Sequence, residues 1–323
     1  MADYKGIKGF KVQYLSADPS NPIIGQTWYN SPSKDLKYTG VTAATWATGG
    51  NLNTAGYQAA GFGTQTDAVM AGRTPLSTAV EEYNGTSWTS VTSYPSPTVS
   101  GNRGFGVQTA GVSVGGEGGA PIVTRSDTQE YNGSTWTSGG GYPTAVSVLY
   151  SCGTATAGLC ASGSPNVNQA NEYNGTSWST GGTPASSGRN NGATGGIQTA
   201  AYMAGGSPVA SFGGVTEEYD GTSWSAGGTL ATPAGANSGF GTLTNGVSVG
   251  GENPVDGALN VTQIYNGTTW STSTNLPRTV TNYAVSGQNS PGSAGIIHGG
   301  PGSAQTDEFT GGGTPLTKTI TVS

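Results

Sequence analysis

One short motif recurs along the chain and constrains its fold more than any other feature. It spans Glu82–Trp88, with the sequence EYNGTSW, and returns with small changes at residues 130–136, 172–178, 218–224 and 264–270. Asn and Gly tolerate positive φ values, so the Asn-Gly or Asp-Gly pair predicts a two-residue type I′ turn between paired strands. One hairpin is only marginally stable in water, so five near-copies predict stacked modules that share a core.

An aromatic pair at constant spacing is the fixed part of this motif. The Tyr and the Trp are always five residues apart in the complete copies. We expect these residues to be structural: Tyr83 and Trp88, Tyr131 and Trp136, Tyr173 and Trp178, Tyr219 and Trp224, and Tyr265 and Trp270. The motif is therefore interpreted as the outer hairpin of a repeated unit.

Each repeat contains two further strand patterns before this hairpin. In the second repeat, the four expected strands are residues 104–108, 112–115, 128–131 and 135–137. Four short antiparallel strands that recur every 42 to 48 residues predict the blade of a β-propeller. No helical period of useful length interrupts this pattern, so the predicted fold class is all-β, with six propeller blades.

The two ends of the repeat region indicate how the ring closes. The sixth repeat ends at Phe309-Thr310-Gly311 without reaching a Trp, whereas Trp46 stands alone ahead of the first repeat. We predict that residues 41–48 supply the outer strand of the last blade, which removes exposed sheet edges. The alternative is that residues 317–322 supply it.

These assignments divide the chain into three parts. Residues 36–316 form the predicted propeller, and residues 317–323 a C-terminal strand or arm. Residues 1–35 form a separate docking segment, with a predicted strand at 9–15 and prolines at 19 and 22. Four of the chain's 11 basic residues lie in its first 34 positions, namely Lys5, Lys8, Lys11 and Lys34. A small module at the end of a repeat array favours attachment to another protein.

Composition excludes several classes of function. Charged residues make up only 9% of the chain and the net charge is −6, so no basic patch predicts nucleic-acid binding. No run of 18 apolar residues predicts a membrane span, and the N-terminus lacks the apolar core of a signal peptide. We therefore expect assembly inside a cell followed by release.

Length variation is concentrated in one connection of each repeat. The intervals from Tyr to Trp and from Trp to the next Gly-Gly pair hardly change, but the interval from Gly-Gly to the next Tyr does. Insertions in repeat proteins map to loops on one face, which is often the binding face. The longest of these connections are Glu117–Asp127, Ser207–Thr216 and Glu252–Val261. The candidate binding residues in them are Glu117, Ile122, Arg125, Phe212, Asn253 and Asp256.

The residues needed for common propeller chemistries are scarce. His298 is the only histidine and there are two cysteines, so copper-radical and zinc sites are not expected. We expect His298 to be a packed or rim residue. A carboxylate precedes most of the repeat tyrosines, at Glu82, Glu130, Glu172, Glu218 and Glu308. Strand alternation places each Glu and Tyr on opposite faces, so we predict no catalytic residues, no metal and no cofactor.

Three smaller features have structural explanations. Arg103, Arg189 and Arg278 precede or begin first strands, where ion pairs with the acids beside the repeat tyrosines are expected. Cys152 and Cys160 are expected to face each other across a hairpin, either as two buried thiols or, alternatively, as a disulfide. The Asn-Gly-Ser/Thr sequons are explained by turn chemistry without glycosylation.

Two resemblances add to this interpretation. The succession of Gly-Gly, Tyr and Trp, with Leu276-Pro277-Arg278 leading into a new blade, resembles the kelch-type β-propeller over roughly residues 41–312. This resemblance implies the architecture but no particular activity. The Thr-, Ser-, Asn- and Gly-rich texture is similar to structural and fibre proteins of tailed bacteriophages, notably marine ones, as are residues 25–30 (GQTWYN) and 36–38 (LKY).

The second resemblance implies a function. It implies a non-enzymatic virion protein, on the tail, the fibre or the capsid, that is assembled in the host cytoplasm and extracellular on the particle. Expected partners are other virion proteins, through the N-terminal segment, and a host-surface glycan or receptor. The alternatives are a cellular adhesin or interaction propeller and, as a minor one, a glycan-cleaving enzyme.

Overall fold

The computed structural model describes residues 12–21, 23, 25–95, 97–288, 290, 292–312 and 315–320. The chain forms two compact units. The larger unit runs from Trp46 to Thr310, and the smaller unit combines the chain up to Thr45 with the chain from Gly311 onward.

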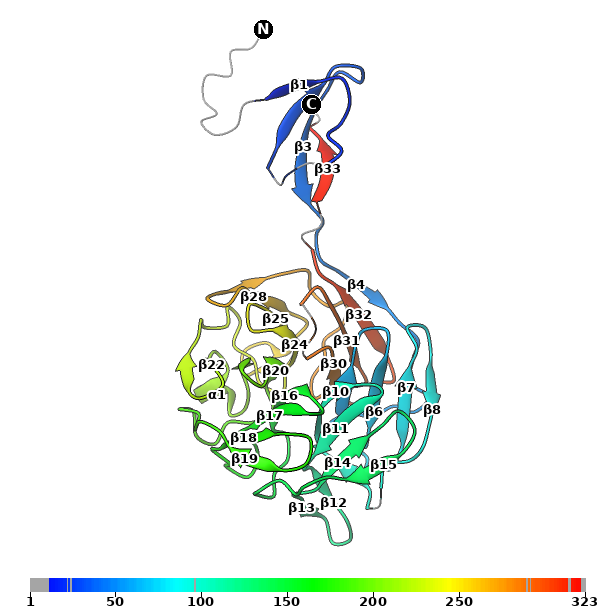
Figure 1. Ribbon diagram of the computed structural model, residues 1–323, viewed down its shortest axis with the longest axis vertical. Coiled ribbons are helices and arrows are strands. Elements are labelled where there is room, and N and C mark those ends of the chain that lie inside the picture. The colour runs from blue at the N-terminus through cyan, green and yellow to red at the C-terminus, as the bar shows by residue number, and fades with distance from the viewer. Residues whose placement is uncertain are drawn as a thin grey trace. The chain divides into compact units, whose positions relative to one another are not determined.

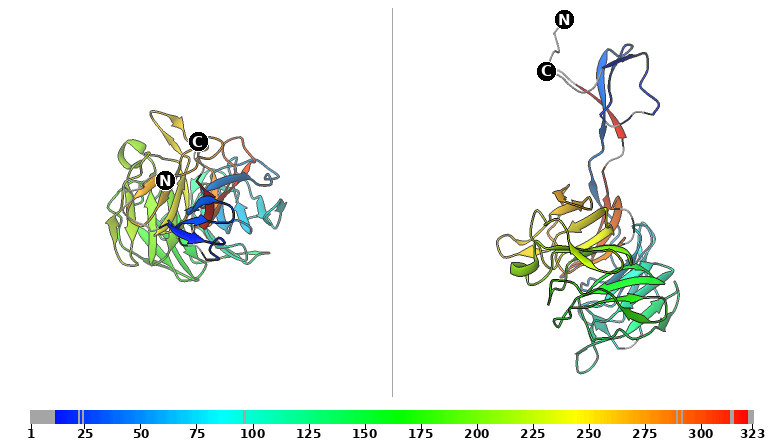
Figure 2. Two further views of the ribbon diagram at one scale, coloured as in Figure 1. Left: turned by 90° about the horizontal axis from the view of Figure 1, so that it is seen from above. Right: turned by 60° about the vertical axis from the view of Figure 1, so that its left-hand side comes forward.

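The larger unit is a β-propeller of six four-stranded antiparallel sheets, one for each sequence repeat (Figures 1 and 2). Blades one to three consist of β5 (Ala60–Gly63), β6 (Ala68–Ala71), β7 (Val80–Tyr83) and β8 (Trp88–Ser90); β10 (Arg103–Val107), β11 (Ala110–Val114), β14 (Thr128–Tyr131) and β15 (Trp136–Ser138); and β16 (Tyr150–Thr154), β17 (Ala157–Ala161), β18 (Ala170–Tyr173) and β19 (Trp178–Thr180). Blades four to six consist of β20 (Ala193–Ile197), β21 (Ala200–Ala204), β22 (Thr216–Tyr219) and β23 (Trp224–Ala226); β24 (Ser238–Thr242), β25 (Asn245–Val249), β28 (Thr262–Tyr265) and β29 (Trp270–Thr272); and β30 (Ala284–Ser286), β31 (Ala294–His298), β32 (Thr306–Thr310) and β4 (Thr45–Thr48).

The sixth blade takes its outer strand from the N-terminal side of the propeller. Strand β4 lies next to β32, and the ring of Trp46 packs 5.0 Å from that of Phe309. The other candidate segment forms β33 (Pro315–Thr319) and pairs instead with β3 (Asp35–Val41). The first strands neighbour one another around the ring, and β30 lies beside β5. Each sheet is open, so the ring closes through contacts between blades.

The Gly-Gly pairs link neighbouring blades through the main chain. The second residue of each pair, or Arg73 in blade one, donates its amide hydrogen to a carbonyl just ahead of the next blade's first strand. The six bonds are Arg73 to Val99, Gly116 to Val146, Gly163 to Arg189, Gly206 to Ala234, Gly251 to Val280 and Gly300 to Gly56, at 2.8 to 3.0 Å. Side chains are poorly tolerated here: a Cβ on Gly115 would lie 2.2 Å from a carbonyl oxygen. The last bond joins blade six to blade one.

The repeat aromatics form the core between blades. In the five complete repeats the Tyr pairs with its Trp across the outer hairpin, with ring centroids 4.7 to 5.0 Å apart. Such pairs contribute about 0.5–1.5 kcal/mol each beyond their buried area. The constant Tyr–Trp spacing therefore preserves a ring contact in every blade.

The turn in this hairpin differs from the predicted type I′ turn. Tyr83 pairs directly with Trp88, so four residues form the loop, and the side chain of Asn84 accepts the amide hydrogens of Thr86 and Ser87. Gly85 has a positive φ of 85°, but Asn84 does not have a positive φ. The turn residues were identified correctly, but Asn acts through its side-chain oxygen rather than through a left-handed backbone.

The smaller unit is a mixed four-stranded sheet. Strand β1 (Gln13–Leu15) is parallel to β2 (Thr27–Asn30), which is antiparallel to β3, and β3 pairs with β33. The predicted boundaries at residues 35/36 and 316/317 are therefore wrong, because β3 and the whole of β33 belong to this unit. Part of the predicted strand at 9–15, together with Lys5, Lys8 and Lys11, lies outside the described residues.

Asp18 organises the smaller unit. It accepts hydrogen bonds from the indole of fully buried Trp28 (3.0 Å), from the Asn30 amide (2.7 Å) and from Lys37 (2.9 Å). These donors, Asn30 first, lower the pKa of its carboxyl group to about 2. All three donors belong to residues 25–30 and 36–38, so that motif has a folding role.

Candidate functional site

The long connections between second and third strands carry small elements of their own. In blade two, β12 (Glu117–Gly118) pairs with β13 (Val123–Thr124) and with β9 (Val99–Ser100), near the lower edge of Figure 1. Blade four carries α1 (Val209–Phe212), and blade five carries a hairpin of β26 (Glu252–Asn253) and β27 (Gly257–Ala258). Because strands alternate in direction, these connections lie at the opposite end of the blades from the Asn-Gly turns.

The blade-two connection presents both polar and apolar groups. Ile122 is 62% exposed, and Glu117 accepts a hydrogen bond from Ser147 of the next blade at 3.0 Å. Arg125 forms an ion pair with Asp127, and both line a pocket of about 230 Å³. The structure thus places Arg125 at the edge of a hollow in the propeller surface.

The connections of blades four and five lie next to one segment, residues 233–235. Ala234 donates its amide hydrogen to Gly213, just after α1, at 2.9 Å. Glu252 exchanges two backbone hydrogen bonds with Gly235, and the Asn253 side chain donates to Pro233 at 3.4 Å. Two of the three predicted binding loops are therefore neighbours, whereas no described hydrogen bond joins the blade-two loop to either of them.

The tip of the blade-five hairpin is held by its own side chains. Asn253 accepts the amide hydrogens of Val255 and Asp256, and its side chain donates to the Asp256 carboxylate at 3.0 Å. Val255 at the tip is 89% exposed. Ala258 borders a second hollow, of about 320 Å³, which Arg278 also lines. Asn253 thus shapes the loop, while Val255, which the sequence did not single out, is its most exposed apolar side chain.

The carboxylates that precede the repeat tyrosines join the blades. Each accepts a hydrogen bond from the tyrosine hydroxyl of the next blade, with Tyr83 to Glu308 at 2.5 Å as an example. The other four pairs are Tyr131–Glu82, Tyr173–Glu130, Tyr219–Glu172 and Tyr265–Glu218. Burial, and then the bond to the carboxylate, raise the pKa of Tyr83 to about 12.

The sixth interface between blades lacks this hydrogen bond on both sides. Ile264 replaces the carboxylate in blade five, and Phe309 replaces the tyrosine in blade six. The loss of the acceptor therefore coincides with the loss of the donor. This matched replacement indicates that the carboxylates stabilise the ring.

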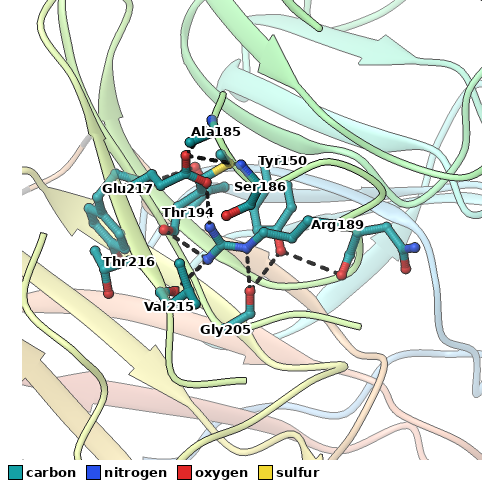
Figure 3. A network of polar contacts seen from close by, with 12 residues as sticks. Tyr150, Ala185, Ser186, Arg189, Thr194, Gly205, Val215, Thr216 and Glu217 are labelled. Atoms are coloured by element: carbon teal, nitrogen blue, oxygen red, sulfur yellow. Dashed lines mark hydrogen bonds and ion pairs between the residues drawn. The ribbon is translucent and has the colours of Figure 1, made fainter. Parts of the chain in front are cut away.

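Two of the three arginines form ion pairs, but with acids other than those predicted. Figure 3 shows fully buried Arg189, which binds Glu217 at 3.0 Å and donates to the carbonyls of three further residues: Gly205, Met203 and Val215. Arg278 binds Asp307 at 2.7 Å. Both partners lie two residues before the repeat aromatic, on the face opposite the predicted acids. Arg103 has no carboxylate partner among the described residues.

Cys152 and Cys160 do not face each other, and that prediction is wrong. Cys152 pairs with Leu159, and Cys160 pairs with Ser151, so the two thiols point to opposite faces of blade three. Both are free and buried, and burial raises the pKa of the Cys152 thiol to about 12. His298 is fully buried against the ring of Trp88, and burial lowers its pKa to about 3.

Sequence reasoning missed a polar cluster on the propeller axis. The residue two positions before each first strand has a positive φ; these six residues are Gln58, Gly101, Val148, Asn191, Ala236 and Asn282. Backbone hydrogen bonds of 2.6 to 3.0 Å connect neighbours in this ring, for example from Gly101 to Gln58 and from Asn282 to Ala236. Because the side chains differ from blade to blade, no motif marks these positions.

Two features are absent from the described residues. No group of three or more His, Cys, Asp or Glu side chains lies together there as a metal site would require. Within the same part of the chain, no helix has the length and apolar character needed to cross a membrane.

Comparison with known proteins identifies the fold alone. No protein-family model and no curated protein matches the sequence. Among solved structures, the one described as the structure of YjhT is similar with a TM-score of 0.66 and 11% identity. That match covers 83% of this chain and 99% of that one. In all, 372 solved chains match, so the architecture is widespread and does not by itself indicate an activity.

Proposed function

We propose that the protein is a non-enzymatic attachment module of a tailed-bacteriophage particle. In this proposal the smaller unit binds other virion proteins, and the long propeller connections contact a host-surface glycan or receptor. The observation that carries the proposal is that variation in length is concentrated at one end of the blades. Two hollows lie beside the varied connections there, at Arg125 and at Ala258.

The topology of the propeller supports separate roles for the smaller unit, which would bind the particle, and for the long connections, which would bind the target. The chain enters the propeller at β4 and leaves it after β32, at the end of blade six where the other blades carry their Asn-Gly turns. The long connections lie at the opposite end of the strands. The chain segments that lead to the smaller unit and the long connections therefore lie at opposite ends of the propeller strands.

The repeat carboxylates support a non-enzymatic role. Five of them accept tyrosine hydroxyls from the neighbouring blade, and Glu217 and Asp307 bind buried or partly buried arginines. A carboxylate that forms such a hydrogen bond or ion pair stabilises the fold.

Many copies of the protein on one particle would allow weak individual contacts to give firm attachment.

The first experiment tests where the protein resides. Mass spectrometry of purified particles from the phage that encodes the chain should detect it in stoichiometric amounts. Its absence from particles, together with binding of the purified protein to cell-surface glycans, would support the cellular adhesin instead.

The second experiment tests the binding end. Residues 250–261 of blade five are replaced by residues 162–169, the short second-to-third-strand connection of blade three. We expect slower adsorption to host cells with an unchanged unfolding midpoint. The matched control is Asn266→Asp, which gives blade five the Asp-Gly turn that blade four has at Asp220. Unchanged adsorption after the loop exchange would contradict a binding role for that connection.

A further inference from the structure

Arg103 lies at one mouth of the central channel, among amide side chains. A cavity of about 20 Å³ on the propeller axis is lined by Arg103 and by residues from all six first strands. Three of the ring residues just ahead of those strands, Gln58, Asn191 and Asn282, carry amide side chains. All four side chains are partly buried, so the cluster is open to solvent on the side of the long connections.

The hydrogen bonds in this cluster use its acceptors and leave donors unused. Arg103 donates to Asn191 Oδ1 at 2.7 Å and to the Asn102 carbonyl at 3.1 Å. Asn191 in turn donates to Asn282 Oδ1 at 2.8 Å, and Gln58 donates to the same oxygen at 3.4 Å. A guanidinium group has five N–H donors, so Arg103 retains donors without a described acceptor. The cluster therefore has a surplus of positively polarised hydrogens.

Arg103 also differs from every other arginine in the chain. The other four form ion pairs: Arg73 with Glu81, Arg125 with Asp127, Arg189 with Glu217 and Arg278 with Asp307. Burial lowers the pKa of the Arg103 guanidinium to about 10, and nearby Tyr150 only partly offsets this effect. The group remains charged at neutral pH, and no carboxylate among the described residues neutralises it.

We propose that Arg103 and the surrounding amides bind a small monoanionic group, either a free halide or the carboxylate of a ligand. The planar guanidinium suits a carboxylate, which it can bind through two parallel hydrogen bonds. The anion enters from the side of the long connections, because Gln288 obstructs the channel farther in: its side chain donates to the carbonyls of Gly61 (2.8 Å) and Val285 (3.0 Å).

The site can be tested with the full-length protein by NMR of chloride. Exchange with a protein site broadens the chloride line, and we expect broadening with the wild-type chain. Acetate and glucuronate should reduce the broadening by competition, whereas glucose should not. If glucuronate competes much better than acetate, a ligand carboxylate is the natural occupant; equal or weaker competition indicates a free anion.

Three variants make the test specific. Arg103→Gln should lower the affinity at least about tenfold, as expected when a charge-assisted contact is lost. Asn191→Asp places a carboxylate against Arg103 and should also abolish anion binding while the protein stays folded, since Asp tolerates positive φ. Lys318→Gln removes the same charge from an exposed strand position and should leave binding unchanged. Equal broadening by wild type and Asn191→Asp, or no binding of either chloride or carboxylates to wild type, would overturn the proposal.

Discussion

A missing hydrogen bond between blades one and two gives the sharpest prediction for stability. In four blades the indole Nε1 donates to a threonine hydroxyl of the preceding blade at 2.8 to 3.0 Å. These pairs are Trp46–Thr262, Trp88–Thr306, Trp178–Thr128 and Trp270–Thr216. For Trp136 of blade two the corresponding position, in blade one, is Val80, and the buried Nε1 of Trp136 has no hydrogen-bond partner among the described residues.

Val80→Thr should therefore stabilise the protein. Thr and Val have similar shapes, and the new hydroxyl would lie where the other blades place their acceptor. A buried unpaired donor costs about 1–3 kcal/mol, and burial of the hydroxyl offsets part of the gain. We expect a net stabilisation of about 1 kcal/mol. The reverse change, Thr306→Val, removes the acceptor of Trp88 and should destabilise by about 1–3 kcal/mol.

Equilibrium urea unfolding, followed by tryptophan fluorescence and by circular dichroism, measures both effects. Val112→Thr is the control, because fully buried Val112 lies in an apolar core cluster. That change should destabilise by about 1–3 kcal/mol, since its hydroxyl would be buried among apolar groups. If Val80→Thr destabilises the protein as much as the control does, the inferred role of these threonines is wrong.

Three further predictions concern contacts within and between blades. Tyr83→Phe leaves Glu308 unpaired, so it should destabilise more than the double variant Tyr83→Phe/Glu308→Ile, which copies the natural interface between blades five and six; a double-mutant cycle without coupling would contradict this. The pKa values of Tyr83, Tyr219 and Tyr265 are raised to about 12, above the usual 10, so their stabilisation should be complete below pH 10 and decrease from pH 10 to 12; melting temperatures that stay constant over this range would refute it. Glu217→Gln should cost about 3 kcal/mol in urea unfolding because it leaves a buried guanidinium unpaired, and a loss below about 1 kcal/mol would contradict that role.

The features predictable from the sequence were those set by local spacing. Tyr–Trp packing depends on residues that are five apart in the sequence. The blades, and the assignment of Trp46 to the outer strand of the sixth blade, therefore followed from the repeats. The boundary of the smaller unit could not be predicted in this way. It depends on pairing between β3 and β33, which are far apart in the sequence and carry no shared motif.

Register and side-chain direction were harder to predict. A shift of one residue in the pairing of β16 with β17 placed Cys152 and Cys160 on opposite faces, because side chains alternate along a strand. The cluster around Arg103 was hidden for another reason. Its ring positions share a backbone conformation rather than a residue type, so Gln58, Asn191 and Asn282 have no sequence signature.

The central claim is that the end of the blades with the long connections binds the target. Val255→Cys and Thr268→Cys place one exposed thiol at each end of blade five, and the native cysteines are buried. A bulky maleimide conjugate is attached to each variant, and binding of the purified protein to host cells is measured. Our account predicts that the conjugate at residue 255 blocks binding and that the conjugate at residue 268 does not. Equal binding by both conjugates, or a block only at residue 268, would contradict it.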